Sequence, residues 1–204
     1  MAPTPALIAA CSVFLLLSAC TPAAVTPPPA SPGTSSMPPP TASQTSPSAT
    51  PSPTWSADQA AAIAAVDEYR AASDQIAADP SSFSEAEMRS LLGKWAGPEV
   101  VKANVASYLS LKKRGFRYGG STIVVSTRAT RAADVGYGTE VVITRCIDQR
   151  AATVLDKAGV EVAESELGYN IPDFLLRQYT AQKRATDKSF RVYGLAPAKG
   201  ECGP

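Results

Sequence analysis

Histidine is absent from this chain of 204 residues. Its absence excludes Ser-His-Asp and Cys-His catalysis, zinc sites built on histidine, and pH switches that depend on imidazole. The sequence also lacks a phosphate-binding loop, an EF-hand pattern and an HExxH motif. We therefore expect no metal, no cofactor, and a domain that is not an enzyme.

Charge is absent from the first quarter of the chain. The first charged side chain is Asp58, and all 19 Lys and Arg and all 18 Asp and Glu follow from there. Acids and bases are interspersed and the net charge is +1, so we expect no nucleic-acid partner, which would require a strong basic excess. Residues 56–204 have the commonest length of a single domain and suffice for one hydrophobic core.

An uncharged apolar run covers residues 6–17. It is too short to span a bilayer, which needs about 20 residues, and it fits the apolar region of a signal peptide. The run ends in Leu17-Ser18-Ala19-Cys20, which resembles the lipobox of bacterial lipoproteins. The resemblance implies a signal peptide over residues 1–19 and a lipid on Cys20 that holds the protein at the extracytoplasmic face of the membrane. The alternative is a plain secretory signal, whose removal leaves an unanchored protein.

The segment that follows is a linker by composition. Residues 21–54 contain eleven prolines and are otherwise mostly Ser, Thr and Ala. Proline removes backbone donors and fixes φ, so this composition predicts neither helix nor sheet. We expect the lipidated cysteine and a disordered linker to fill residues 20–55. A passive tether is the simplest interpretation, and an O-glycosylated stalk has the same composition.

Helical signals dominate the first half of the predicted domain. Ser56 and Gln59 have capping-box spacing, and apolar residues recur behind them at three and four residues, which predicts a helix over 56–78. A second box at Ser84 and Glu87 predicts a short helix over 84–92. Pro98 favours the start of a third helix, and Gly115 is expected to end it after the basic run 112–114.

After Gly115 the hydrophobic period changes to two, which is typical of strands. We expect strands over residues 121–130, 139–148, 153–155, 174–185 and 189–195, the last two as a hairpin. Helices followed by an antiparallel sheet define the α+β class. Because several strands carry apolar residues on both faces, the sheet is expected to curl around the long helix.

This order of elements resembles the NTF2-like (cystatin-like α+β cone) domains of actinobacterial lipoproteins, which stand behind a Pro/Thr-rich linker. The motifs that carry the resemblance are Tyr118-Gly-Gly120, Arg145-Cys-Ile-Asp148, Asp156-Lys-Ala-Gly159 and Gly200-Glu-Cys202. The resemblance implies N-terminal helices packed on a curved sheet, with a cone-shaped interior. Three aromatic residues are candidates to line that interior: Tyr69, Trp95 and Tyr108. Trp95, which lies between two predicted helices, is the weakest of these, because we favour for it a plug at the end of the domain over a place at the mouth of the cone.

Two of the four cysteines are expected to be used in export and lipidation, and two remain in the folded domain. Cys11 leaves with the signal peptide and Cys20 takes the lipid, so Cys146 and Cys202 remain in an oxidising compartment. A redox-active pair usually needs CxxC-like spacing, which these two lack. We therefore predict a structural disulfide between Cys146 and Cys202.

One kind of catalysis remains possible without histidine. It uses a tyrosine and an aspartate together, and the tyrosine donates a hydrogen bond to a developing oxyanion. Asp67, Tyr69, Tyr108 and Asp148 are candidates by residue type. The simpler interpretation places both tyrosines in the core and both aspartates in solvent. We therefore predict no catalytic residue.

Three functions remain open. The first is a non-enzymatic, membrane-anchored interaction or accessory module with a protein partner in the cell envelope. The second is a binder of a small apolar ligand in the cone cavity, and the third is a His-free isomerase or dehydratase. A pocket near 300 Å³, the low end for ligand sites, would separate the second from the first. A basic cluster at 112–114 with Arg117 could also contact anionic lipid, although helix capping already explains it.

Overall fold

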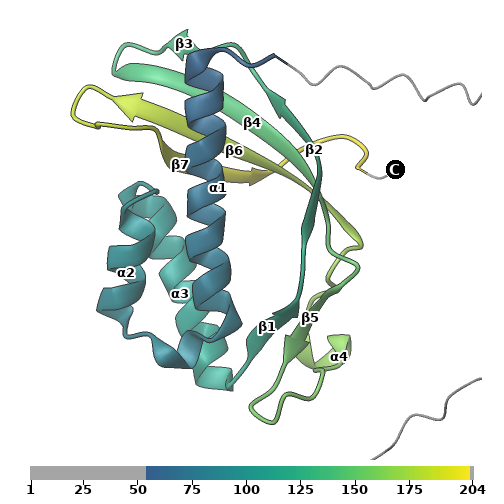
Figure 1. Cartoon of the computed structure of the whole chain (residues 1–204). Coiled ribbons are helices and arrows are strands. Elements are labelled where there is room, and N and C mark those ends of the chain that lie inside the picture. The colour runs from purple at the N-terminus through teal and green to yellow at the C-terminus, as the bar shows by residue number, and fades with distance from the viewer. Residues whose placement is uncertain (1–53, 203–204) are drawn as a thin grey trace, which may run out of the picture. The chain divides into compact units, whose positions relative to one another are not determined.

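Helices come first in the folded part of the chain, as the capping signals predict. The structure, a computed structural model, describes residues 54–202. The three helices pack beside one another in Figure 1, and a 3-10 turn, η1 (Pro80–Ser82), joins the first two. They are α1 (Ala57–Ala78), α2 (Glu85–Gly93) and α3 (Pro98–Arg114).

Local hydrogen bonds set the helix ends. The Ser56 and Ser84 side chains each accept from a backbone N–H three residues on, and Gln59 and Glu87 complete the two capping boxes. Gly115 ends α3 with a φ of +73°, the left-handed conformation that glycine adopts most readily. Within the described residues, no helix is both long and apolar enough to cross a membrane.

The strands form a main antiparallel sheet in the order β2-β4-β6-β7, with β3 pairing to β4 beyond the end of β2. Two further strands, β1 and β5, pair with each other in a separate sheet. The bounds are β1 (Arg117–Gly120), β2 (Ile123–Ala129), β3 (Ala133–Asp134), β4 (Gly138–Asp148), β5 (Ala152–Leu155), β6 (Phe174–Arg184) and β7 (Arg191–Pro197). Neither the pairing of β1 with β5 nor the short helix α4 (Glu164–Leu167) was predicted from the sequence.

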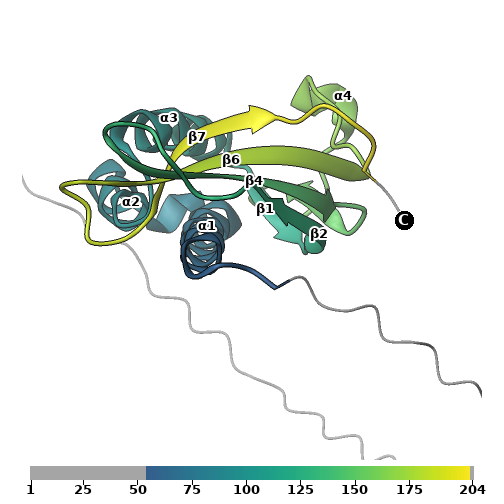
Figure 2. The ribbon, with the colours of Figure 1, turned by 90° about the horizontal axis from the view of Figure 1, so that it is seen from above.

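The helices cover one face of the main sheet. Every second residue of β4 and β6 points toward them, so Val141, Ile143, Tyr179 and Ala181 are buried in one core with residues of α1, α2 and α3. Figure 2, where α1 is seen almost end-on, shows β4, β6 and β7 bending together past the helices. The predicted α+β class, with N-terminal helices packed on a curved antiparallel sheet, is confirmed.

The disulfide predicted from the cysteine count is present. Cys146 lies in β4 with its side chain on the face away from the helices, and it is joined to Cys202 at a Cα–Cα distance of 5.4 Å. The bond closes the end of the chain onto the centre of the sheet.

Candidate functional site

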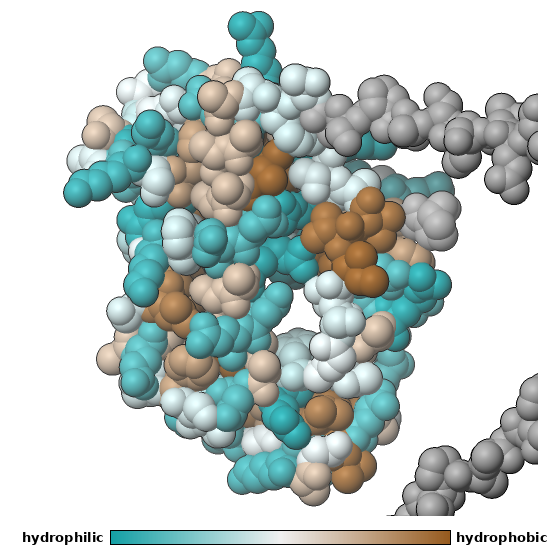
Figure 3. Space-filling view, in the orientation of Figure 1, coloured by the Kyte–Doolittle hydropathy of each residue, from teal (hydrophilic) through white to brown (hydrophobic). Residues whose placement is uncertain are grey.

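A cavity of about 890 Å³ lies between the helices and the end of the sheet near β1. Its volume falls inside the range of about 300–1,000 Å³ that is usual for small-molecule sites. In Figure 3 the surface is open between the α1 side and the β1–β2 side. The wall comes from α1 and α3 on one side, and from β1, the ends of β4 and β6, and the segment after α4 on the other.

Small residues leave this space empty. Ser73 and Ala77 of α1 and Ser107 of α3 face it, so part of each helix face leaves the space free of large side chains. On the opposite wall, Gly120 has a φ of +72°, and a Cβ there would lie 1.7 Å from the Ala151 carbonyl oxygen. The close approach of β1 to the residues before β5 therefore requires glycine at position 120.

Tyrosine is the commonest large side chain in the wall. Tyr69, Tyr108, Tyr118, Tyr169 and Tyr179 all line the cavity. The Tyr108 hydroxyl donates to Ser73 Oγ at 2.9 Å, and the hydroxyls of Tyr118 and Tyr169 lie 3.2 Å apart. The result is an aromatic surface that carries hydroxyl groups on apolar rings, a surface suited to organic ligands.

Four of these phenols, those of Tyr69, Tyr108, Tyr118 and Tyr179, stay protonated at neutral pH. Burial raises the pKa of Tyr69 to about 12 and raises the pKa values of Tyr108, Tyr118 and Tyr179 above their ordinary value. Neutral phenols donate hydrogen bonds but do not act as bases. Among the cavity residues that the structure describes, no tyrosine hydroxyl donates to a carboxylate.

Four charged side chains line the cavity, three of them arginines. Arg70 donates to Thr122 Oγ1 at 3.0 Å across the opening between α1 and the start of β2. Arg114 donates to the Glu166 carbonyl oxygen at 2.5 Å. Partial burial raises the pKa of Asp74, and nearby Arg70 opposes that rise. The fourth side chain is Arg177 of β6.

The structure places two of the three aromatic candidates in the wall. Tyr69 and Tyr108 line the cavity, each less than a tenth exposed. Trp95 is not among the lining residues, and this part of the prediction is corrected. Trp95 lies in the α2–α3 connection, where its carbonyl accepts from Val192 N at 2.8 Å and its ring packs against the main core. Pairing of this connection to β7 directs Trp95 away from the cavity.

The aspartates considered for catalysis lie elsewhere. Asp67 accepts a hydrogen bond from Arg145 Nη1 at 2.6 Å, and Asp148 pairs with Arg150 at 2.7 Å. From the sequence, both aspartates are expected to lie simply in solvent, whereas the structure places both in ion pairs. Neither is part of the cavity wall, so Asp67, Tyr69, Tyr108 and Asp148 are not assembled into one site.

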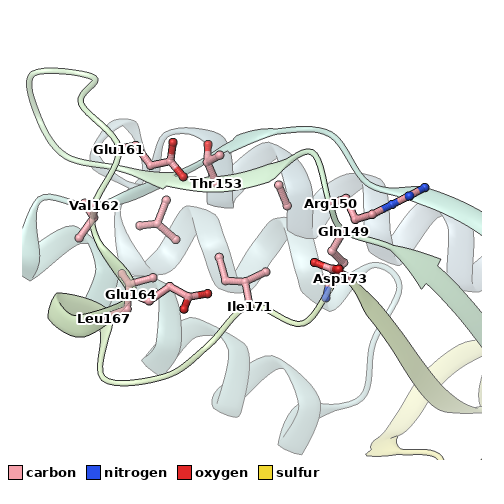
Figure 4. Close-up of a pocket in the computed structure, with 11 residues that line it drawn as sticks. Gln149, Arg150, Thr153, Glu161, Val162, Glu164, Leu167, Ile171 and Asp173 are labelled. Carbon is pink, nitrogen blue, oxygen red and sulfur yellow. The ribbon is translucent and has the colours of Figure 1, made fainter. Parts of the chain in front are cut away.

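A second, smaller hollow of about 180 Å³ lies beneath β5 and α4, as Figure 4 shows. It is below the usual size of a ligand site. Glu161, Glu164 and Asp173 contribute carboxylates to its wall. No group of three or more His, Cys, Asp or Glu in residues 54–202 has the arrangement of a metal site.

Sequence reasoning missed Arg177, Tyr118, Tyr169 and Tyr179. A usable signal exists for two of them, because Leu175, Arg177 and Tyr179 alternate on one face of a strand whose next inward residue is Ala181. An arginine in such an apolar register indicates either a buried ion pair or a binding site. No comparable local pattern marks Tyr118 or Tyr169.

The sequence matches no family model and no curated protein. Among solved structures, the intermembrane space region of the chloroplast protein ARC6 is similar, with a TM-score of 0.48 and 9% identity over 70% of this chain and 98% of that chain. A de novo designed β-sheet protein is also similar, with a TM-score of 0.32 and 16% identity over 70% of this chain and 93% of that chain. Neither similarity bears on what this chain binds.

Proposed function

We propose that this protein is a lipid-anchored, NTF2-like binding domain that holds a small organic ligand in the cavity between α1, α3 and β1. The observation that carries the proposal is the volume of the cavity, about 890 Å³, well above the roughly 300 Å³ at which ligand sites begin. An interior filled by aromatic side chains would instead favour a purely structural domain.

The proposed lipid anchor and the proposed family are based on the sequence. Cys20 and the linker lie outside the described residues, so lipidation, the tether and the extracytoplasmic location are parts of the proposal. The NTF2-like assignment is supported by three helices that precede a curved antiparallel sheet. A binding role without catalysis is supported by the raised pKa values of the phenols and by the absence of histidine from the sequence.

Binding of the neutral dye N-phenyl-1-naphthylamine tests the proposal. The dye is titrated by fluorescence against the full chain carrying Cys20→Ala, which prevents the expected lipidation. Ser107→Trp places a large ring in the cavity wall and should weaken dye binding by about tenfold, or about 1.4 kcal/mol. Ala106→Trp, on the same helix but outside the wall, is the matched control.

Equal dye affinities for the Ser107→Trp and Ala106→Trp variants would place the dye outside the cavity. A wild-type protein that binds neither this dye nor its anionic analogue would remove the support for a ligand-binding function.

A second candidate function, an interaction module, is supported by an exposed apolar strand at the sheet edge. Ile123, Val124 and Val125 of β2 are 63%, 37% and 45% exposed, and a hydrophobic patch is visible over β2 in Figure 3. β2 is the end strand of its sheet, and edge strands bind extended peptides. A photo-crosslinking residue at Val125 should capture an envelope protein, and one at exposed Lys188 should not.

A further inference from the structure

Two arginines face each other across the centre of the main sheet. Arg145 of β4 is the direct cross-strand partner of Arg177 of β6, so the two side chains leave the sheet on the same face. That face is turned toward the helices and the cavity, because Arg145 reaches Asp67 of α1. Like charges in directly opposed positions destabilise a sheet unless something compensates them.

Only one of the two positive charges has a carboxylate partner. Asp67 accepts from Arg145 at 2.6 Å, while Arg145 itself is 2% exposed and its Nε is buried without a hydrogen-bond partner. Within residues 54–202, the Arg177 side chain takes part in no hydrogen bond or ion pair, although it lines the cavity. Arg177 is exposed, so its guanidinium is accessible to whatever enters the cavity.

Arg177 shares the cavity wall with tyrosine hydroxyls. Tyr69, Tyr108, Tyr118 and Tyr179 line the same cavity and are neutral at physiological pH. Burial raises the pKa of each, and the positive charge of Arg177 opposes that rise in all four. A guanidinium among phenols offers charge-assisted hydrogen bonds to an acidic group.

The remaining charges of the wall add to this preference. Arg70 and Arg114 bring two more positive charges, and Asp74 brings the single carboxylate among the described lining residues. Apolar surface is also present, from Leu111, Ile147, Ile171 and Leu175. An occupant that suits this wall has one acidic end and one apolar end.

We propose that the cavity binds an amphipathic organic anion, whose carboxylate or sulfonate group pairs with the Arg177 guanidinium. Its apolar body lies against the aliphatic part of the wall formed by Leu111, Ile147, Ile171 and Leu175. This inference rests on the ligand-binding function proposed above and narrows the ligand from any small organic molecule to an amphipathic acid. The anion also relieves the repulsion between Arg145 and Arg177.

Two dyes that differ only in an acidic group test the inference. 8-Anilino-1-naphthalenesulfonate is N-phenyl-1-naphthylamine with a sulfonate added, so a comparison of their affinities reports the effect of the acidic group on the same aromatic frame. Both dyes are titrated against the full chain with Cys20→Ala. The loss of affinity caused by adding Ser107→Trp measures how much of the binding takes place in the cavity. The anionic dye should bind about tenfold more tightly than the neutral dye, as expected for one charge-assisted contact.

Arg177→Gln should remove that preference, weakening the anionic dye about tenfold and changing the neutral dye by less than about twofold. Arg177→Lys should retain part of it. Lys183→Gln, which removes a charge from the same strand outside the cavity wall, should change neither affinity. Without dye, Arg177→Gln should raise the melting temperature, because Arg145 then faces an uncharged side chain.

The two proposals fail differently. If both dyes bind in the cavity with equal affinity, or if Arg177→Gln weakens both to the same extent, the anion inference is wrong and the ligand-binding function stands. If neither dye distinguishes wild type from Ser107→Trp, the ligand-binding function is wrong.

Discussion

Arg145 is the most deeply buried charged side chain among the described residues. Its side chain is 3% exposed, whereas that of its partner Asp67 is 58% exposed. A buried guanidinium needs its counter-charge far more than an exposed carboxylate does. The pair therefore fixes α1 to the centre of β4, at the point where Arg177 adds a second positive charge.

Asp67→Asn should destabilise the domain by about 2 kcal/mol, because it leaves the buried Arg145 guanidinium without a counter-charge. Urea denaturation followed by circular dichroism measures the change. Glu68→Gln, the exposed neighbour on the same helix, should change the free energy of unfolding by less than about 0.5 kcal/mol. Similar values for the two variants would contradict the assigned role of the ion pair.

The raised pKa of Tyr69 predicts how the stability of the domain changes at alkaline pH. Burial raises its pKa from 10.0 to about 12 in the folded protein, so its contribution to stability is complete below pH 10 and is lost as the pH rises through about 12. Tyr69→Phe should flatten the fall in melting temperature over that interval relative to wild type, since phenylalanine cannot ionise. Parallel curves for the two proteins above pH 10 would show that the phenol of Tyr69 ionises as readily when folded as when unfolded.

Among the elements, β4 carries the most connections. It pairs with β2, β3 and β6, its inward face enters the core, and its outward face carries the bond to Cys202. The chain beyond β7 is otherwise attached to the sheet by the hydrogen bond from Ala198 N to Leu176 O, at 3.0 Å. The disulfide therefore decides whether the C-terminal segment stays on the sheet.

Cys202→Ser should lower the free energy of unfolding by about 4 kcal/mol, the loop-closure value for a bond that spans 56 residues of sequence. The fold should persist, because neither cysteine contributes to the helix–sheet core. Thermal denaturation measures the loss, and amide exchange should increase after Pro197 but not in β4. Two titratable thiols in the unreduced wild-type domain would contradict the bond.

At the scale of the whole molecule, the first charged residue lies in the first turn of the first described helix. α1 starts at Ala57, and the first charged residue of the chain is Asp58 in its first turn. The uncharged residues before it carry the predicted signal peptide, Cys20 and the linker. A long tether would let the domain reach a ligand or partner beyond the lipid headgroups while remaining attached.

Cys20→Ala should move the protein from the membrane fraction to the soluble fraction of the cells that make it, because the thiol that accepts the lipid is gone. Immunoblotting of separated fractions measures the shift. Ser35→Ala, in the linker, is the control and should leave the protein with the membranes. An intact mass that shows an unmodified Cys20 on the wild-type mature chain would contradict the anchor.

The sequence by itself determined the elements that depend on neighbours along the chain. The capping boxes at Ser56 and Ser84, the glycine at 115 and the alternation in β4 and β6 act through hydrogen bonds and side-chain periods within a few residues. The disulfide followed from counting, because two of four cysteines were assigned elsewhere. The α4 helix escaped prediction because it is four residues long and has no side-chain cap.

Only the tertiary structure decided where the site is. The cavity exists because α1, α3 and the start of β6, which are distant in sequence, leave a space that their side chains do not fill. The opposition of Arg145 and Arg177 arises from the register of β4 on β6, which 31 intervening positions do not reveal locally. The direction of Trp95, which the sequence left open between the mouth of the cone and a plug, depends on the pairing of the α2–α3 connection with β7. A chain encodes its elements through local contacts, but empty space and unpaired charge appear only when distant elements meet.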